Sequence, residues 1–445
     1  MMDNIAAIAT PYGTGAISVI RASGPDSIQL VQSVFDRKLK NKGYTISYGN
    51  IVNEEGVVDE VLVSVFKAPH SFDGEDCCEI SCHGGVYVTN MVLETLLNAG
   101  FRMALPGEFS KRAFLNHKID LTQSEAIMDI IASTNKKALK AAENSLHSHT
   151  KMMIRGLREL ILNMLASIEV NIDYPEYDDA VYVDEEILLP QIKDLIIKME
   201  GILDKSSIAR VIREGVKVAI VGKPNVGKSS ILNMLLDEEK AIVSNIAGTT
   251  RDTVEGYLAL NNITLHFIDT AGIHESDDYV ENIGIERSRK AMNEADVVFL
   301  VLDSSRPLDE FDYNLLDETK DKNRIIIYNK VDLGSSFEKT DEMLALSTKS
   351  KEGFIELENK IEKLVKTNEF DVSDANYLSN TRHIHLMKKA LASLKNAEDA
   401  CQMQLDSSFV EIDLKDCFDT LGEITGEAYD DELIDSLFSK FCLGK

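Results

Sequence analysis

The spacing of hydrophobic positions changes three times along the 445-residue chain. Up to about residue 117, alternating or β-branched runs at residues 16–20, 57–66 and 78–81 are separated by glycine and proline. This pattern predicts mixed strands and helices. From Ile119 the apolar period becomes helical, which predicts two long amphipathic helices that pack on other helices. Their apolar stripes are Leu157, Leu160, Ile161, Met164, Leu165, Ile168 and Ile172, then Ile192, Leu195, Ile196, Met199, Ile202 and Leu203.

Residues 215–365 show a third pattern, in which short apolar strands alternate with segments of helical length. The strands are expected at residues 216–221, 263–268, 297–302 and 325–328. Such alternation predicts a doubly wound α/β sheet. After Asn368 the helical period returns, with Ile384, Met387, Leu391 and Leu394 on one face. We therefore expect one helical domain, split in sequence, with the α/β domain inserted into it. The acidic segment 173–184 is expected to be a solvated connection.

The composition narrows the class of protein. Lys and Arg number 47 and Asp and Glu 74, which gives a formal net charge of −27. Because phosphate affinity comes mainly from basic side chains, binding of nucleic acid would need a local basic patch or a basic partner. The sequence contains no apolar run of membrane-spanning length and starts without a basic signal region. Its six cysteines have no framework spacing, so we expect a reduced, cytoplasmic protein.

Residues 222–229 read GKPNVGKS, directly after a predicted strand and before a predicted helix. This is the phosphate-loop pattern in the context that it requires. Glycines let the backbone N–H groups wrap a phosphate closely at the start of the helix. Lys228 is expected to reach the β- and γ-phosphates, and the Ser229 hydroxyl is expected to bind Mg²⁺.

Residues 329–332 read NKVD and follow a buried strand. A carboxylate at Asp332 can accept hydrogen bonds from both N1–H and the exocyclic amine of guanine, whereas adenine has no N1–H donor. Asp332 therefore predicts guanine, with Asn329 and Lys330 beside it. Ser347, Thr348 and Lys349 end the next strand and are expected to support the base, although Thr348 stands where alanine is usual.

Two further motifs lie between these. Asp269, Thr270, Ala271 and Gly272 close a predicted strand; Asp269 can hold Mg²⁺ through water, and the Gly272 N–H can reach the γ-phosphate. A threonine in the sequence GTTRD at residues 248–252 can complete the Mg²⁺ shell when that phosphate is present. The five motifs resemble the TRAFAC-type GTPase fold over about a third of the chain.

The sequence lacks a glutamine near His274, where a Ras-like GTPase has its water-orienting residue. Another group, expected within residues 275–286, must orient the water, and another cation must offset transition-state charge. Asn225 and the oxygen-rich residues 244–249 suit a monovalent metal ion. An ordinary turn residue is the alternative interpretation of Asn225.

Motifs outside this region resemble one family over the whole chain. They are IAAIATPYGTGAISVIR at residues 5–21, GED at 74–76 with HGG at 83–85, PGEFSKRAF at 106–114 and FCLGK at 441–445. They resemble the MnmE family, also called TrmE, of tRNA-modification GTPases.

The resemblance implies a multidomain α/β plus α protein. It divides the chain into an N-terminal α+β tetrahydrofolate-binding and dimerisation domain (1–117), a split helical domain (118–214 and 368–445) and an inserted P-loop GTPase domain (215–367). It implies a homodimer that works with the flavoprotein MnmG (GidA), which would carry most of the tRNA binding. Together they would modify C5 of the wobble uridine, position 34, to an aminomethyl or carboxymethylaminomethyl group. A folate, 5-formyl- or 5,10-methylene-tetrahydrofolate, would supply the carbon, and potassium would stimulate GTP hydrolysis.

The resemblance also implies roles for single residues. Potassium would lie on Asn225, Ser244, Ile246 and Thr249, and Mg²⁺ on Ser229 and Thr250. Glu281 would orient the water, with Lys228 as the second catalytic residue. Folate contacts would fall on Arg21, Glu79, Lys118 and Lys445, with Cys442 nearby. The remaining nucleotide contacts would be Val226, Gly227, Ser230, Asn245, Ala247 and Gly248.

Three alternatives stay open on the sequence. A ribosome-assembly GTPase of the Era or EngA kind shares the nucleotide motifs but should carry a basic RNA-binding domain. A nucleotide-gated scaffold without turnover shares the same parts. A metal site at Cys77, Cys78, Cys82 and His83 lacks ligands at zinc spacing.

Overall fold

The computed structural model describes residues 3–40, 42–173, 185–236, 256–260, 263–268, 289–350, 352–365, 376–427 and 431–444. These residues form two compact units. One contains Met1–Met128 with Gly422–Lys445, and the other contains Asp129–Leu421. The four-part domain organisation expected from the sequence divides the chain differently and stays a prediction.

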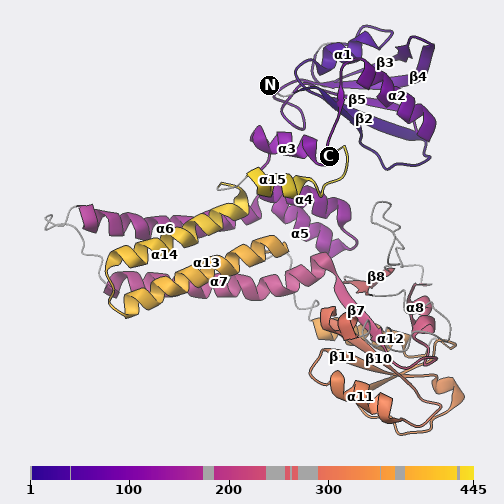
Figure 1. The fold of residues 1–445 in the computed structure, drawn as a ribbon, viewed down its shortest axis with the longest axis vertical. Helices are drawn as coiled ribbons and strands as arrows, with labels where there is room; N and C mark the ends of the chain where they lie inside the picture. Colours follow the sequence, from indigo (N-terminus) through magenta and orange to yellow (C-terminus); the bar gives the residue numbers. More distant parts are fainter. Residues whose placement is uncertain are drawn as a thin grey trace. The chain divides into compact units, whose positions relative to one another are not determined.

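The first unit is built on a six-stranded sheet with the order β3-β4-β5-β2-β1-β6 (Figure 1). Its strands are β1 (Ile5–Ile8), β2 (Ile17–Ser23), β3 (Thr45–Asn53), β4 (Gly56–Phe66), β5 (Cys77–His83) and β6 (Arg102–Met103). Its helices are α1 (Ser27–Ser33), α2 (Val86–Asn98), α3 (Glu108–Leu115), most of α4 (Leu121–Ala132) and α15 (Asp431–Phe438). The sequence missed β1, β3 and β6.

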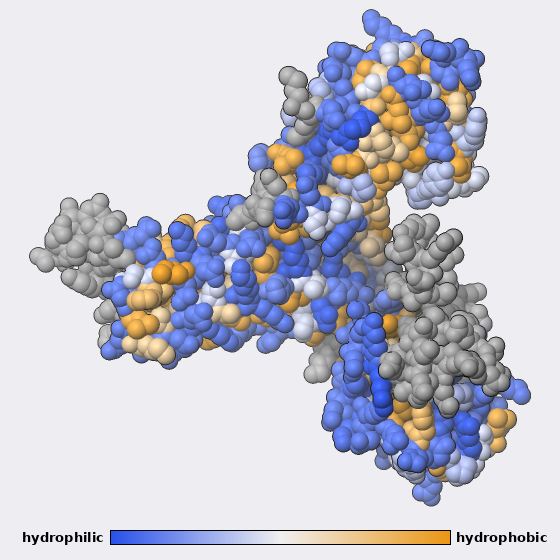
Figure 2. All heavy atoms as spheres, in the orientation of Figure 1, coloured by the Kyte–Doolittle hydropathy of each residue, from blue (hydrophilic) through white to orange (hydrophobic). Residues whose placement is uncertain are grey.

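Strand register separates the two faces of this sheet. Ile20 and Ile80 face the core beneath α1 and α2, together with Val63, Val92 and Leu96. The next residues along each strand lie on the opposite face, because side chains alternate. There Arg21 pairs across the strands with Glu79, and Tyr48 pairs with Leu62. This second face leaves large apolar side chains exposed, and Figure 2 shows hydrophobic residues at the surface of this unit. The exposed side chains on this face are Ile17 (65%), Ile46 (61%), Tyr48 (50%) and Leu62 (45%).

The terminal segment completes the core of the same unit. Phe438 and Phe441 are buried against Phe114 and Leu121 in one cluster. Gly107 has φ +68°, and a Cβ there would lie 2.3 Å from the Phe438 carbonyl oxygen. Only glycine therefore fits where the PGEFSKRAF segment passes the tail.

The second unit contains a group of helices in which α7 and α13 lie side by side (Figure 1). They are α5 (Lys136–Leu146), α6 (His149–Asp173), α7 (Glu185–Glu214), α13 (Thr381–Gln402) and α14 (Ser407–Thr425), whose last turn passes into the first unit. The predicted stripes face the bundle core: Ile161, Ile192 and Met387 are each fully buried. Leu160 is an exception, since it is 39% exposed. The acidic connection lies outside the described residues apart from Asp173, which ends α6.

The same unit carries the predicted α/β sheet, with the strand order β12-β11-β10-β7-β9-β8. The strands are β7 (Val216–Val221), β8 (Gly256–Leu260), β9 (Ile263–Phe267), β10 (Val297–Asp303), β11 (Arg324–Asn329) and β12 (Met343–Leu346). β8 is antiparallel to β9, and the other pairs are parallel. Helices α8 (Lys228–Leu236) and α12 (Phe354–Val365) pack on one face, and α11 (Glu310–Glu318) packs on the other. Helices on both faces confirm the doubly wound class.

No helix among the described residues combines the length and hydrophobicity needed to cross a membrane.

Candidate nucleotide-binding site

The phosphate loop joins β7 to α8 at the carboxyl end of the sheet, where doubly wound folds bind ligands. Gly222 has φ +152°, and a Cβ there would lie 2.5 Å from the Val301 carbonyl oxygen. Gly227 has φ +102°, and its Cβ would lie 2.3 Å from the Asn329 amide nitrogen. Asn225 also has a left-handed backbone, with φ +62°. The glycines therefore let the loop turn tightly against two neighbouring strands before the first turn of α8.

Lys228 curls back over this loop. Its Nζ donates to the carbonyl oxygens of Gly222 at 2.8 Å and Lys223 at 2.7 Å. Burial lowers the pKa of the Lys228 ammonium to about 8. A phosphate beside this group would favour the charged form, so the loop couples anion binding to the charge of Lys228.

The predicted base-reading segment is bonded directly to the phosphate loop. The Asn329 side chain is buried and its Nδ2 donates to the Val226 carbonyl at 2.8 Å. Lys330 Nζ donates to the Asn225 carbonyl at 2.7 Å and to Asp303 Oδ2 at 2.7 Å. Phosphate and base motifs a hundred residues apart in sequence are thus held in fixed register.

Asp332 lies in a short 3₁₀ turn (Val331–Leu333) just after β11 and is exposed. Its Oδ1 accepts a hydrogen bond of 2.9 Å from the hydroxyl of Ser347, which is fully buried. Ser347 therefore orients the carboxylate that was assigned to guanine. Thr348 and Lys349 follow in the turn after β12.

A second set of contacts on the loop was not foreseen from the sequence. The Lys223 ammonium, in the variable part of the motif, forms an ion pair with Asp309 and one of 2.8 Å with Asp312. Both carboxylates form the capping box of α11, so this helix start anchors the phosphate loop. The sequence at residues 309–312 could have predicted the start of α11, but its contact with Lys223 depends on the fold.

Several assigned residues lie outside the described residues: 244–250, 269–272, Glu281 and Lys445. Of the assigned potassium and magnesium ligands, Asn225 and Ser229 are described.

Two of the residues assigned to folate, Arg21 and Glu79, are in direct contact in the first unit. Arg21 donates to Glu79 Oε1 through Nε at 3.1 Å and Nη2 at 2.8 Å. Its guanidinium lies 4.7 Å from the Phe72 ring centroid and 5.6 Å from that of Phe109, and its Nη1 donates to the Gly444 carbonyl at 3.3 Å. Arg21 thus lies within β2, not after it as the sequence indicated, and it connects the sheet to the tail.

Lys118 and Cys442 form hydrogen bonds with residues other than Arg21 and Glu79. Lys118 Nζ donates to the Pro69 carbonyl at 2.8 Å. Cys442 is exposed, and its carbonyl accepts from Gly107 N at 3.4 Å. Cys77, Cys78 and Cys82 are buried, and burial raises the pKa of the Cys78 thiol to about 12. No cluster of three metal-ligating side chains occurs among the residues that the structure describes.

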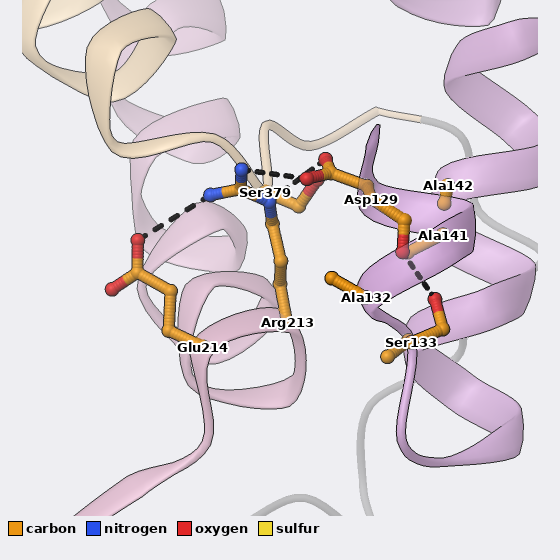
Figure 3. Close-up of a pocket in the computed structure, with 9 residues that line it drawn as sticks. Asp129, Ala132, Ser133, Ala141, Ala142, Arg213, Glu214 and Ser379 are labelled. Atoms are coloured by element: carbon orange, nitrogen blue, oxygen red, sulfur yellow. Dashed lines mark hydrogen bonds and ion pairs between the residues drawn. The ribbon is translucent and has the colours of Figure 1, made fainter. Parts of the chain in front are cut away.

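The helical part meets the nucleotide-binding sheet at the start of β7, beside a cavity of about 200 Å³ (Figure 3). There Arg213, in the last turn of α7, binds both carboxylate oxygens of Asp129 at 2.7 and 2.8 Å. Thr134 and Asn135 contact the hydroxyl of Thr264 in β9 at 2.5 and 3.1 Å. The sequence alone did not single out these residues.

A doubly wound sheet, a phosphate loop and an NKVD segment bonded to that loop through Asn329 and Lys330 define a guanine-nucleotide-binding P-loop protein. Family comparisons specify it further. The model described as "GTP-binding protein TrmE N-terminus" matches residues 4–118, and "MnmE helical domain" matches residues 121–442. The chain belongs to the MnmE (TrmE) family of tRNA-modification GTPases.

Individual relatives match over the whole length. The tRNA modification GTPase MnmE of Acholeplasma laidlawii is 52% identical over all of this chain and 99% of its own length. That of Aster yellows witches'-broom phytoplasma is 47% identical over 100% and 99%, and that of Lactococcus lactis IL1403 is 46% identical over 100% and 98%.

Proposed function

We propose that this chain is a cytoplasmic, potassium-stimulated GTPase that acts in tRNA modification. With a flavoprotein of the MnmG (GidA) kind it would convert C5 of the wobble uridine of certain tRNAs to an aminomethyl or carboxymethylaminomethyl form. The observation that carries the proposal is the direct bonding of the NKVD segment to the phosphate loop through Asn329 and Lys330. Full-length membership of the family supports the choice of tRNA over the ribosome-assembly alternative.

The nucleotide-site residues fit the ions that GTP hydrolysis would need. Ser229 follows Lys228 in the first turn of α8, where its hydroxyl would hold Mg²⁺. Asn225 offers an amide oxygen from a left-handed turn whose carbonyl is fixed by Lys330. Magnesium bound to the Ser229 hydroxyl would neutralise part of the phosphate charge. A potassium ion held by Asn225 with Ser244, Ile246 and Thr249 would replace the missing cation, and Glu281 would orient water.

The pair of Arg21 and Glu79 fits a folate. A pterin presents donors and acceptors that a carboxylate can bind, and Arg21 holds Glu79 at 2.8 Å with Phe72 beside it. We infer that Glu79 binds the pterin edge and that Arg21 orients Glu79. Lys118 and Lys445 would meet the acidic tail. The folate, when bound, would supply the one-carbon unit.

The exposed apolar face of the first sheet supports a homodimer through this unit. Ile17, Ile46 and Leu62 are each at least 45% exposed on one face. Burying such side chains between two copies would remove apolar surface from water.

The deciding experiment is mass spectrometry of tRNA nucleosides from a strain lacking this protein. C5-modified wobble uridines should disappear and return when the parent gene is restored. Restoration with Glu281→Ala should fail although the protein accumulates normally. Unchanged wobble uridines in the deletion strain would exclude the proposed reaction.

A further inference from the structure

The loop between α1 and β3 is strongly basic in a chain whose net charge is −27. Arg37, Lys38, Lys40 and Lys42 fall within six residues, and all four are exposed. Such a patch is what an otherwise acidic chain requires to bind a polyanion.

The described residues of the loop are tied to the sheet core and to neighbouring side chains. Leu39, between Lys38 and Lys40, is buried at 3% exposure in the sheet core. Its N–H donates to the Gln32 side chain at 2.7 Å, which in turn donates to the Arg37 carbonyl at 2.9 Å. The Thr45 hydroxyl contacts the carbonyls of Lys40 and Lys42 at 2.9 and 2.6 Å. These bonds hold the backbone at Arg37, Leu39, Lys40 and Lys42.

Acidic groups next to the loop are engaged elsewhere. Both oxygens of Asp36 accept bonds of 2.7 Å from Asn50, one from its backbone N–H and one from its side chain. Glu60 accepts from the Tyr48 hydroxyl. Asp76 lies 4.0 Å from Lys67, a further cation beside Gly43. The four cations of the loop still outnumber the two neighbouring carboxylates, Asp36 and Glu60, so the patch is positive on balance.

Lysine at a sheet edge often serves to prevent pairing with another chain, and β3 is an edge strand. Here that edge is already covered. Val52 N donates to the Val34 carbonyl at 2.8 Å, and Asp36 N donates to the Asn50 carbonyl at 3.0 Å. The cations extend beyond the covered edge, so edge protection does not account for them.

An exposed aromatic ring adjoins the cations. Tyr44 follows Lys42 by two residues and is 73% exposed. Cations that bind phosphates next to rings that stack on bases are the elements of RNA recognition. An acidic protein surface would use the lysines but has no need of the ring.

We propose that the loop formed by Arg37, Lys38, Lys40 and Lys42, with Tyr44, binds the phosphate backbone and an unstacked base of tRNA. This gives the chain an RNA contact of its own, beside any that a partner supplies. The inference rests on the tRNA chemistry of the family and is independent of the folate and potassium assignments.

Fluorescence anisotropy of labelled tRNA with the full-length protein, at several salt concentrations, tests the proposal. The triple variant Lys38→Gln/Lys40→Gln/Lys42→Gln should bind roughly tenfold more weakly near 0.1 M salt, with the slope of log K against log salt reduced by about 2. The triple Lys→Arg variant should retain both values, since it keeps the charges. GTP turnover and thermal stability should match the parent in all of them.

A charge-matched control removes three exposed lysines from the helical part, Lys388→Gln/Lys389→Gln/Lys415→Gln. It should change tRNA affinity little. Equal losses in both triple variants would mean that only total charge matters and would overturn the proposal, as would an unchanged slope. Retained tRNA binding with lost binding of a partner protein would assign the loop to an acidic protein surface instead. None of these outcomes alters the wobble-uridine test of the proposed function.

Discussion

Substitution of Asp332 by asparagine tests how the site selects guanine. The carboxylate is fixed at 2.9 Å by the buried Ser347 hydroxyl and is otherwise exposed. Guanine would donate two hydrogen bonds to it, from N1–H and the exocyclic amine. An amide can accept the first but meets the second with its own N–H₂ group. Losing one charge-assisted bond and weakening the other should cost about 2–4 kcal/mol, or roughly 30- to 700-fold in affinity.

The same substitution should change the preferred base. Xanthine carries a carbonyl in place of the exocyclic amine, so the side-chain amide in the Asp332→Asn variant would donate where the carboxylate accepted. Competition between GTP and XTP against a fluorescent GDP analogue measures both affinities. Ser347→Ala is the control: it frees the carboxylate without changing its chemistry and should cost about 1 kcal/mol for GTP, with no gain for XTP. Parental GTP affinity in Asp332→Asn, or no gain for XTP, would show that Asp332 does not contact the base.

The remaining predictions concern catalysis, folate and pH. GTP hydrolysis should be much faster in potassium than in sodium, and Asn225→Ala should remove the difference; equal rates for the parent in both salts would argue against the ion site. Glu281→Ala should leave GTP affinity nearly unchanged and lower turnover by roughly 10²-fold or more, as for a contact made in the transition state; unchanged turnover would make Glu281 a surface residue. Glu79→Ala should abolish calorimetric binding of 5-formyl-tetrahydrofolate without affecting GTP turnover in potassium, whereas parental folate affinity would place the pocket elsewhere. Burial lowers the pKa of Lys228 to about 8, and bound phosphates should raise it again, so GTP binding above pH 8 should take up a proton and weaken as the pH rises. Calorimetry at pH 8.5 in buffers of different ionisation enthalpy measures that proton, and an identical heat in every buffer would contradict it.

Strands with uninterrupted apolar residues were predictable. The residues of β10 up to Leu302, and those of β7 apart from Lys217, are hydrophobic on both faces because helices cover both sides of the sheet. β3 was missed because Gly49 and Asn50 interrupt its alternation. Gly49 is required there by packing: a Cβ would lie 2.6 Å from the Asp36 carboxylate and 2.7 Å from the Phe35 ring. That contact depends on the fold and leaves no local signal.

The same distinction applies to the site. Lys228 and Asp332 were identified because their chemistry fixes their spacing from neighbouring residues. The ion pair of Lys223 with Asp312 joins residues 89 apart, and the contact of Lys330 with Asp303 joins residues 27 apart. The order of the strands in the sheet determines which distant residues come into contact. No short stretch of the sequence reveals that order. Likewise, the amphipathic period of α15 predicts a buried face but not that Phe114 covers it.

The terminal segment gives the chain an order of assembly. Lys111 forms an ion pair with Asp435, 324 residues further on, and Phe438 and Phe441 fill the core around Phe114. At 5–20 residues per second, a ribosome needs roughly 15–65 s to synthesise the residues between them. The apolar surface around Phe114 and Leu121 therefore stays uncovered by Phe438 and Phe441 in the nascent chain. During this time the whole nucleotide-binding part is synthesised and can fold. The unit that is translated first is therefore completed last. Its core can be completed only after all the residues between Lys111 and Asp435 have been synthesised.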